Sequence, residues 1–210
     1  RDGNNAENFQ GKLVEITAGD IGSDVVVSDT NIANLKNLNI PQYDGVITIG
    51  STEYEYSSFD IAIDKETGEY TYTFHTKREI TATYADESPV RVGESLNYKG
   101  IPYYQAKLNE FIRTYAEHFN DLHNRGEDLE GNKGIDFFTA LDPATGECYE
   151  FVEYDLLTEE ELEEMDDETV FSSIPSVDED TNILNPASYY FMTAANVRVN
   201  EQILHDPGMI

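Results

Sequence analysis

The longest regular pattern of apolar positions lies between Ile101 and Gly126, in the sequence IPYYQAKLNEFIRTYAEHFNDLHNRG. Its large apolar side chains recur in steps of three and four, which places them on one stripe of an α-helix. They are Ile101, Tyr104, Leu108, Phe111, Tyr115, Phe119 and Leu122. Pro102 suits the first turn of a helix, and Gly126 suits the position after its end. The pattern predicts one long helix, and Phe111 and Phe119 are expected to be buried.

Short stretches of the N-terminal half alternate apolar and polar residues, as half-buried β-strands do. The expected strands are Leu13–Ile16, Val25–Val27, Val46–Ile49, Thr52–Tyr56, Phe59–Ile63, Glu69–His75 and Ile80–Tyr84. Between the second and third of these, residues 28–41 hold enough apolar side chains for one or two helical turns before Pro41. Residues 12–92 are therefore expected to form one small antiparallel β module.

After the long helix the expected elements are short. They are a hairpin of Phe138–Leu141 with Cys148–Val152, an acidic helix at Thr158–Glu168, a loop at 172–188, a strand at Ala195–Asn200, and a turn or helix after Asp206. The fold predicted from these patterns is α+β, with mainly antiparallel β modules attached to one long α-helix that acts as a spine.

The charge of the chain is strongly negative, with 13 Lys and Arg against 42 Asp and Glu and a formal net charge of −29. Such a surface repels phosphate backbones and anionic lipids, so nucleic acid and membrane are poor partners. No apolar run is long enough for a transmembrane helix. Because the sequence starts at Arg1 and lacks a leader, it is expected to be a fragment or a processed product.

Candidate metal sites are weak. His118 and His123 share the helix with Glu117 and Asp121, but a spacing of five residues places two side chains roughly 140° apart around a helix. Calcium-like alternation occurs at Asp128, Glu130 and Asn132 and again at Asp178, Asp180 and Asn182. Both runs lack glycine at the sixth position and Glu at the twelfth, so acidic turns are the preferred interpretation. No metal and no cofactor are expected.

Catalytic chemistry is also not indicated. The single cysteine, Cys148, excludes an intramolecular disulfide, has no histidine near it in sequence, and is expected to fill a small buried position in a hairpin strand. No nucleophile elbow or glycine-rich phosphate loop occurs. An enzyme remains an alternative only if the fold gathers His75, His118 or Cys148 with carboxylates in a deep cleft.

The sequence contains HNRGEDLEGNKGIDFF, ANVRVNEQILHDPGMI and Arg1-Asp2-Gly3, three separate segments that resemble the flagellar hook-associated protein 1 family. The helix is followed by HNRGEDLEGNKGIDFF, which is similar to the family's pattern G-x-D-x-x-G-x-x-G-x-x-F-F. The matching residues are Gly126, Asp128, Gly131, Gly134, Phe137 and Phe138. Residues 195–210 (ANVRVNEQILHDPGMI) resemble the strand and D-P segment before the family's C-terminal helices, and Arg1-Asp2-Gly3 resembles the end of its arginine-aspartate helix. The three segments occur in the family's order.

This resemblance implies a non-enzymatic structural protein of the bacterial flagellum, an adaptor at the hook–filament junction. The helical part would be rod-like with β-rich insertions. Its segments would be 1–11, the edge of the rod; 12–92, the β module; 93–138, the helix and the family loop; 139–188, a second variable insertion; and 189–210, a return strand and the start of a C-terminal rod segment.

The same resemblance implies the partners and the location of the protein. The partners would be the hook protein, neighbouring hook-associated proteins, further copies of the full-length protein, and an export chaperone at its C-terminal end. The protein would be extracellular, exported by the flagellar apparatus without a cleaved signal peptide. The helix face of Tyr104, Leu108, Phe111, Tyr115, Phe119 and Leu122 would pack internally or form a subunit interface.

A second hypothesis starts from the tyrosines. The chain holds 14 Tyr and no Trp, with clusters at Tyr54-Glu55-Tyr56 and Tyr70-Thr71-Tyr72 that are expected on an exposed β-sheet. Tyrosine offers a large, rigid and amphipathic contact area at recognition surfaces. The alternative is therefore an extracellular binding or adhesion module whose Tyr-rich strands contact a glycan or a host protein.

Overall fold

The computed structural model describes residues 9–64, 67–93, 101–128, 130–149, 181–184 and 188–209. The chain forms two compact units. The first comprises residues 1–107 and 177–184, and the second comprises residues 108–176 and 185–210. Helix α1 (Ile101–Asn124) starts in the first unit and continues in the second.

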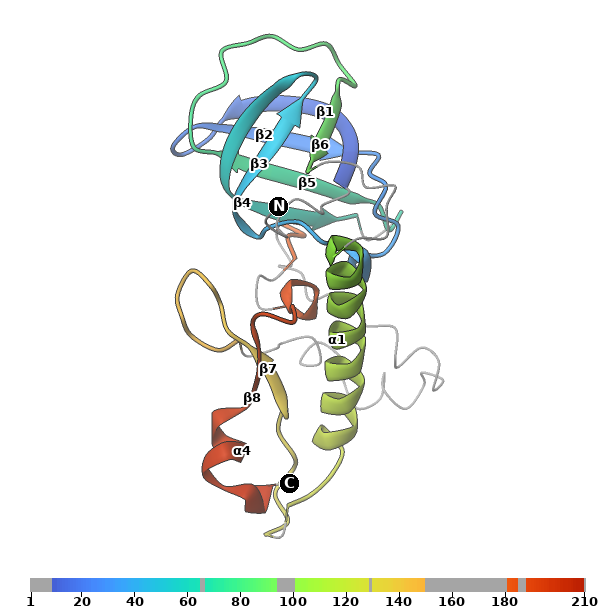
Figure 1. Cartoon of the computed structure of the whole chain (residues 1–210), viewed down its shortest axis with the longest axis vertical. Coiled ribbons are helices and arrows are strands. Elements are labelled where there is room, and N and C mark those ends of the chain that lie inside the picture. Colours follow the sequence, from blue (N-terminus) through green and yellow to red (C-terminus); the bar gives the residue numbers. More distant parts are fainter. Residues whose placement is uncertain are drawn as a thin grey trace. The chain divides into compact units, whose positions relative to one another are not determined.

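Six antiparallel strands close into a barrel in the first unit (Figure 1). They are β1 (Phe9–Ala18), β2 (Ser23–Ser28), β3 (Tyr43–Ile49), β4 (Thr52–Ile63), β5 (Tyr70–Thr76) and β6 (Pro89–Val92). Their order is β1-β2-β5-β4-β3-β6, and the four-residue β6 pairs with both β1 and β3. Closure leaves no sheet edge open, so even a short strand has backbone partners on both sides.

Alternate side chains of the strands fill the barrel. In β2, Val25 and Val27 are fully buried, whereas Val26 between them is only partly covered. This is the period of two that a strand with one core face requires. Aromatic rings occupy the centre, where the Phe74 ring lies 5.1 to 5.4 Å from the rings of Phe9, Tyr56 and Phe59.

Two irregular segments complete the barrel core. The connection from β2 to β3 contains the 3-10 helix η2 (Leu35–Asn37), which the Asn34 side chain caps by accepting a hydrogen bond from the Lys36 N–H. Its apolar side chains Ile32, Leu35 and Leu38 are buried. From far along the chain, Leu184 is also buried, and its N–H donates to the carbonyl oxygen of Ile61 in β4.

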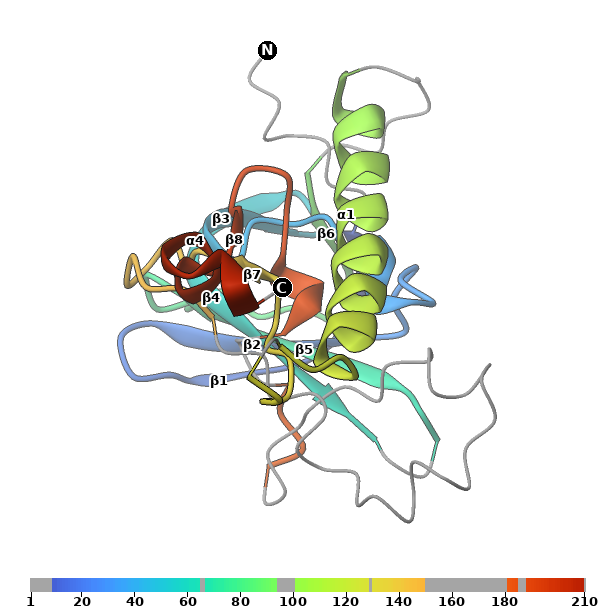
Figure 2. The same cartoon turned by 90° about the horizontal axis from the view of Figure 1, so that it is seen from below.

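The described part of the second unit combines α1 with a small sheet and short helices. Strands β7 (Phe138–Ala140) and β8 (Val197–Val199) pair in antiparallel fashion and lie side by side in Figures 1 and 2. The short helices are the 3-10 helix η3 (Tyr189–Phe191), α4 (Glu201–His205) and the 3-10 helix η4 (Pro207–Met209). All three side chains of η3 are buried.

The fold class expected from the sequence is wrong. A closed six-stranded barrel dominates the structure, and α1 is the only long helix among the described residues. The protein is therefore not a helical rod with β-rich insertions. The physical reason is that closure depends on pairing β6 with β1, strands separated by about 80 residues in sequence. Local periodicity carries no information on such long-range pairing.

Single elements were predicted better than their arrangement. The long helix is confirmed, and Thr52–Tyr56 and Phe59–Ile63 are parts of one strand, β4, with a register shift between Tyr56 and Ser58. Ile80–Tyr84 is not a strand; instead Ile80 is buried in an irregular segment, and its N–H donates to the Ser23 Oγ at 2.9 Å. The neighbouring β6 is the sixth strand.

The hairpin expected after the helix is confirmed at its turn, where an antiparallel bridge joins Leu141 to Cys148 and the N–H groups of Asp142 and Tyr149 donate to the carbonyl oxygens of Glu147 and Ala140. The regular strand pairing differs from the expectation, because β7 pairs with β8. Residues 150–152 of the expected second strand lie outside the described residues. A three-residue strand has little pattern of its own, so its partner is chosen by tertiary packing. The acidic helix expected at Thr158–Glu168 lies outside the described residues.

Candidate functional site

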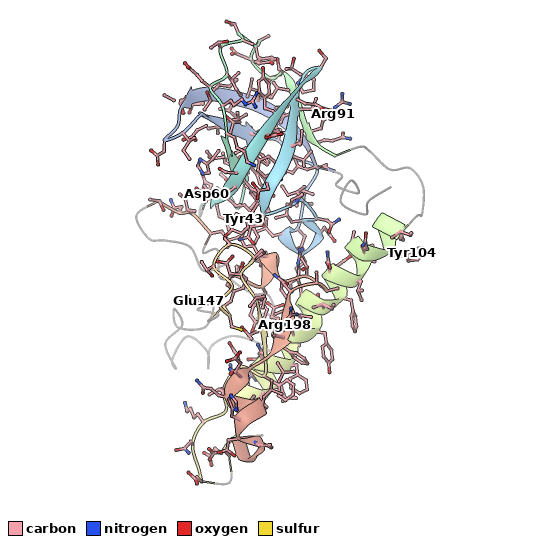
Figure 3. The ribbon with its side chains drawn as sticks, turned by 60° about the vertical axis from the view of Figure 1, so that its left-hand side comes forward. Tyr43, Asp60, Arg91, Tyr104, Glu147 and Arg198 are labelled. Carbon is pink, nitrogen blue, oxygen red and sulfur yellow. The ribbon has the colours of Figure 1, made fainter. Side chains whose placement is uncertain are left out.

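Helix α1 presents its apolar stripe outward. Five large side chains of the expected helix face are 47 to 71% accessible: Tyr104, Leu108, Phe111, Tyr115 and Leu122. Phe119 is half-buried. Figure 3 shows Tyr104 projecting away from the helix axis. The expectation that Phe111 is buried is wrong, because 60% of this residue is exposed.

The aromatic members of this stripe form a continuous row. The Phe111 and Tyr115 rings stack at 5.7 Å, and the Tyr115 ring lies 5.9 Å from that of Phe119. Phe119 continues the row to Phe137 at 5.0 Å and to Phe138 at 5.3 Å. The row therefore runs from a solvent-exposed end at Phe111 to a packed end beside β7, and its rings support one another.

The opposite, polar side of α1 is the side that is packed. Arg113, Ala116, Glu117, Asn120 and Asp121 are all buried. Asn120 makes three hydrogen bonds: its Nδ2 donates to the Phe138 carbonyl and to the Tyr189 hydroxyl, both at 2.7 Å, and its Oδ1 accepts from the Phe138 N–H at 2.8 Å. The amphipathic helix is thus inverted relative to the usual rule, in which the apolar stripe faces the core.

Further side chains on this polar side bind backbone groups. The Arg113 Nε donates to the Met192 carbonyl at 2.7 Å, and the Asn109 Oδ1 accepts from the Ala194 N–H at 2.9 Å. Burial lowers the pKa of Arg113 to about 10, which leaves the guanidinium charged at neutral pH. A charge that is out of water but bonded to a carbonyl strongly favours this one geometry.

Sequence reasoning missed these polar residues. Their spacing of three and four residues, from Asn109 through Arg113, Glu117, Asn120 and Asn124, is the same helical period that identified the apolar stripe. Polar residues in that register are ordinarily assigned to a solvated face. Only the tertiary structure reveals that Asn109, Arg113 and Asn120 bind backbone groups.

The family-like loop after α1 comprises residues 126–138, and hydrogen bonds or backbone angles account for the residues at its turns. The Gly126 N–H donates to the His123 carbonyl at 3.0 Å and ends the helix. Asp128 closes the next turn, because its Oδ1 accepts from the backbone N–H groups of Glu130 and Asn132, both at 2.8 Å. The pKa of Asp128 is lowered most by the Asn132 side chain, whose Nδ2 donates to Asp128 Oδ2 at 2.9 Å, and further by the backbone hydrogen bonds. Gly131 follows with a positive φ of 84°.

The loop then returns to the helix. Gly134 passes so close to the backbone carbonyl of His123 that a Cβ there would collide with it. The His123 Nδ1 donates to the Ile135 carbonyl at 2.6 Å, and the Asn124 Nδ2 donates to Asp136 Oδ1 at 2.7 Å. The loop therefore delivers Phe137 and Phe138 to the aromatic row. These bonds fix the loop to the end of α1.

A second cluster of titratable groups lies on the barrel. His75 of β5 contacts Asp24 of β2 through Nδ1 at 2.8 Å and Asp60 of β4 through Nε2 at 2.9 Å. Burial of the imidazole opposes its protonation, but the hydrogen bonds and charges of the two carboxylates outweigh burial and raise the pKa of His75. The cluster joins three neighbouring strands by side chains, and Asp60 is labelled on the barrel in Figure 3.

The Tyr-rich surface expected from the sequence is only partly present. Tyr56 and Tyr72 point into the barrel and are fully buried, so they belong to the core. Tyr54 is half-buried, and its hydroxyl lies 2.6 Å from that of Tyr84. The hydrogen bond to Tyr84, with burial as a smaller cause, raises the pKa of Tyr54 to about 12. Residues two apart in a strand share one face, so Tyr54 lies on the same face of β4 as the buried Tyr56.

The other candidate residues are dispersed. Cys148 is exposed, so the expectation of a buried role is wrong. His75 belongs to the first unit, whereas His118 and Cys148 belong to the second. Across the described residues no group of three His, Cys, Asp or Glu side chains is arranged to hold a metal ion. Asp178 and Asp180 lie outside the part of the chain that the structure describes.

No protein-family model, curated protein or solved structure matches the chain. Within the described ranges, no helix has the length and apolar character needed to cross a membrane.

Proposed function

We propose that this chain is part of a structural, non-enzymatic component of the bacterial flagellum, an adaptor at the hook–filament junction. Its proposed site is the outward face of α1, formed by Tyr104, Leu108, Phe111, Tyr115, Phe119 and Leu122. The proposed occupant of this face is a helix of a neighbouring subunit. The protein acts outside the cell, after export by the flagellar apparatus.

The observation that carries the proposal is the inversion of α1. In a chain that acts alone, an exposed aromatic stripe is unfavourable, and Arg113 and Asn120 are buried in its place. In an assembly the exposed stripe is favourable, because a neighbouring subunit covers it on binding. Helix-to-helix contacts through side chains at steps of three and four are the ordinary way to cover such a stripe.

The sequence resemblance supports the choice of assembly. The loop residues that resemble the family pattern, from Gly126 to Phe138, are those that end α1 and extend the aromatic row in this chain. The proposed partners are the hook protein, neighbouring hook-associated proteins and further copies of the full-length protein. A proposed export chaperone binds the C-terminal region of the full-length protein.

The experiment is a motility and filament assay in cells of the source organism. Cells lacking the full-length protein are expected to keep their hooks but to shed unassembled filament protein. Replacement of the chromosomal copy by Phe111→Asp with Tyr115→Asp is expected to give the same defect, with the protein still exported. The control is Gln105→Asp, an exposed position of α1 outside the stripe. Complete filaments on cells that lack the protein would refute the proposal.

A second candidate function, an adhesion module, is favoured by one observation. Tyr54 and Tyr84 form a hydrogen-bonded pair with their rings edge to face on the barrel, and both are partly exposed. The test is a glycan array with the unaltered protein and with Tyr54→Phe. Saturable binding that Tyr54→Phe reduces would support this function, and its absence across the array would count against it.

A further inference from the structure

We infer that Asn120 and Arg113 are positioning residues that fix the rotation of α1 about its own axis, so that the polar side stays bonded and the aromatic stripe stays outward. This inference deepens the proposed function, because it concerns how the same helix face is presented. It is carried by hydrogen bonds within the second unit and does not depend on the identity of any partner.

The bonds converge on one side of the helix over four turns. Asn109, Arg113, Asn120, His123 and Asn124 each bind a group outside α1, and four of these partners are backbone groups of Ala194, Met192, Phe138 and Ile135. Phe138 belongs to β7, Met192 directly follows η3, and Ala194 and Ile135 lie in the loop segments that flank these elements. A helix held at several points along one side cannot rotate without breaking all of these bonds.

Asn120 is the centre of the arrangement. Its amide satisfies both the N–H and the C=O of Phe138 and also binds the Tyr189 hydroxyl, so one side chain joins α1 to β7 and to η3. It is completely buried. Removal of the amide would leave both backbone groups of Phe138 without this partner, and a buried polar group left unsatisfied costs more than its bond contributes when formed.

The magnitudes favour the observed orientation over the inverted one. Turning the stripe inward would cover five large side chains that are now about half exposed, which is favourable. The same rotation would turn the bonded side chains toward solvent and leave the buried backbone groups that they bind unsatisfied, and each such group costs more than the half-burial of one apolar side chain contributes. The free energy of the hydrogen bonds on the polar side therefore exceeds the gain from burying the apolar side. The buried Arg113 makes the orientation of the helix specific, although its burial is itself unfavourable.

The packed side of α1 offers little apolar surface. Ala116 is the only apolar residue among the five buried positions of α1 from Arg113 to Asp121. A small residue allows β7 and η3 to approach the helix closely, and it leaves no room for a ring of the stripe. Shape and hydrogen bonding thus select the same rotation.

The test measures which side of α1 is accessible. Single cysteines are placed at Tyr115 in the stripe and at Ala116 on the packed side, in a Cys148→Ser background because Cys148 is exposed. Each is labelled with a thiol reagent under native conditions, and helix content is followed by circular dichroism. In the otherwise unaltered chain, the cysteine at 115 is expected to react at least about 10-fold faster than the one at 116, since protection follows the free energy of local opening.

The same two reporters are then combined with Asn120→Leu and Arg113→Met. With helix content retained, the ratio of the two rates is expected to fall toward one or to invert. Gln105→Leu, at an exposed position of α1, is the control and should leave the ratio unchanged. An unchanged ratio in the Asn120→Leu, Arg113→Met protein would overturn the inference.

A milder variant covers the case in which the double change unfolds the unit. Asn120→Asp keeps the size and the Oδ1 acceptor but loses the donor to the Phe138 carbonyl and the Tyr189 hydroxyl. It is expected to lower the ratio about 2- to 10-fold, the range that corresponds to one or two hydrogen bonds. No change of the ratio in this folded variant would also refute the inference. Both readouts are independent of filament growth, so this inference and the proposed function fail separately.

Discussion

Phe111 and Tyr115 lie one helical turn apart with their rings nearly parallel, at an interplanar angle of 17° and a centroid distance of 5.7 Å. Both residues are nevertheless exposed, by 60% and 48%. Their stacking is a contact within the stripe, and the stripe reaches β7 through Tyr115 and Phe119, whose rings lie 5.7 and 5.3 Å from that of Phe138. Four predictions follow from this arrangement and from the packing of the barrel and the loop.

Phe111→Asp is expected to change the free energy of unfolding by less than about 1 kcal/mol, because an exposed ring contributes little to the core. Phe119→Ala should cost about 1–3 kcal/mol, less than a fully buried ring, since Phe119 is half-buried and contacts Phe137 and Phe138. Urea denaturation of the two variants measures the difference. Equal losses in both would show that the Phe111 ring is covered in the isolated chain.

Tyr72→Ala is expected to destabilise the barrel by about 3–5 kcal/mol, the usual effect of removing a buried aromatic ring. The Tyr72 ring is fully buried and lies 4.9 Å from that of Phe9. Tyr54→Phe, which keeps the ring and removes only the bond to Tyr84, should cost about 0.5–1.5 kcal/mol. Thermal unfolding followed by the β-sheet circular dichroism of the barrel compares the two variants. A Tyr72→Ala protein as stable as the unaltered chain would contradict the inward position of this ring.

The His75 cluster should make the barrel more stable at mildly acidic pH. Its folded-state pKa is raised above the unfolded value of about 6.5. The contribution is therefore fully present below that unfolded value, and it is lost as the pH rises through the folded pKa. The measurement is the difference in unfolding free energy between the unaltered chain and His75→Gln, which should shrink from about pH 5.5 to about pH 9.

This comparison uses a difference because the net charge of −29 also weakens the folded state as the pH rises. The control is Asp60→Asn, which removes one of the two carboxylates on the imidazole. It should lower the pKa of His75 in an NMR titration of the ring. A difference between the unaltered chain and His75→Gln that grows with pH would reverse the sign and refute the prediction.

Two glycines of the family-like loop should respond differently to alanine. Gly131→Ala is expected to cost about 1 kcal/mol, because its φ of 84° is unfavourable for an L-residue although the space around it is open. Gly134→Ala should cost about 2–3 kcal/mol, because its Cβ would strike the backbone carbonyl of His123. Urea denaturation of the second unit measures both. Gly146→Ala, at another open turn with positive φ, is the matched control for Gly131→Ala.

The sequence was sufficient for the elements with a strong period. The helix at Ile101–Asn124 and the long strands of the barrel were predicted because steps of three and four, or of two, are imposed by the backbone itself. The loop residues Gly126 and Gly131 were also identified from sequence, as expected for positions at which the backbone restricts side chains. Periodicity failed for β6, whose four residues are too few to show a pattern.

The sequence by itself thus determined that α1 has one apolar and one polar side, and that acidic surface surrounds a β-rich chain. The tertiary structure decided that the six strands close into a barrel and that the polar side of α1 is the one that packs. The physical reason is that Asn120 and Arg113 bind backbone groups of Phe138 and Met192, which lie 18 and 79 residues further along the chain. Hydrophobic periodicity predicts that the more apolar side of a helix is buried. It carries no information on the hydrogen-bond partners that cause the polar side to be buried here.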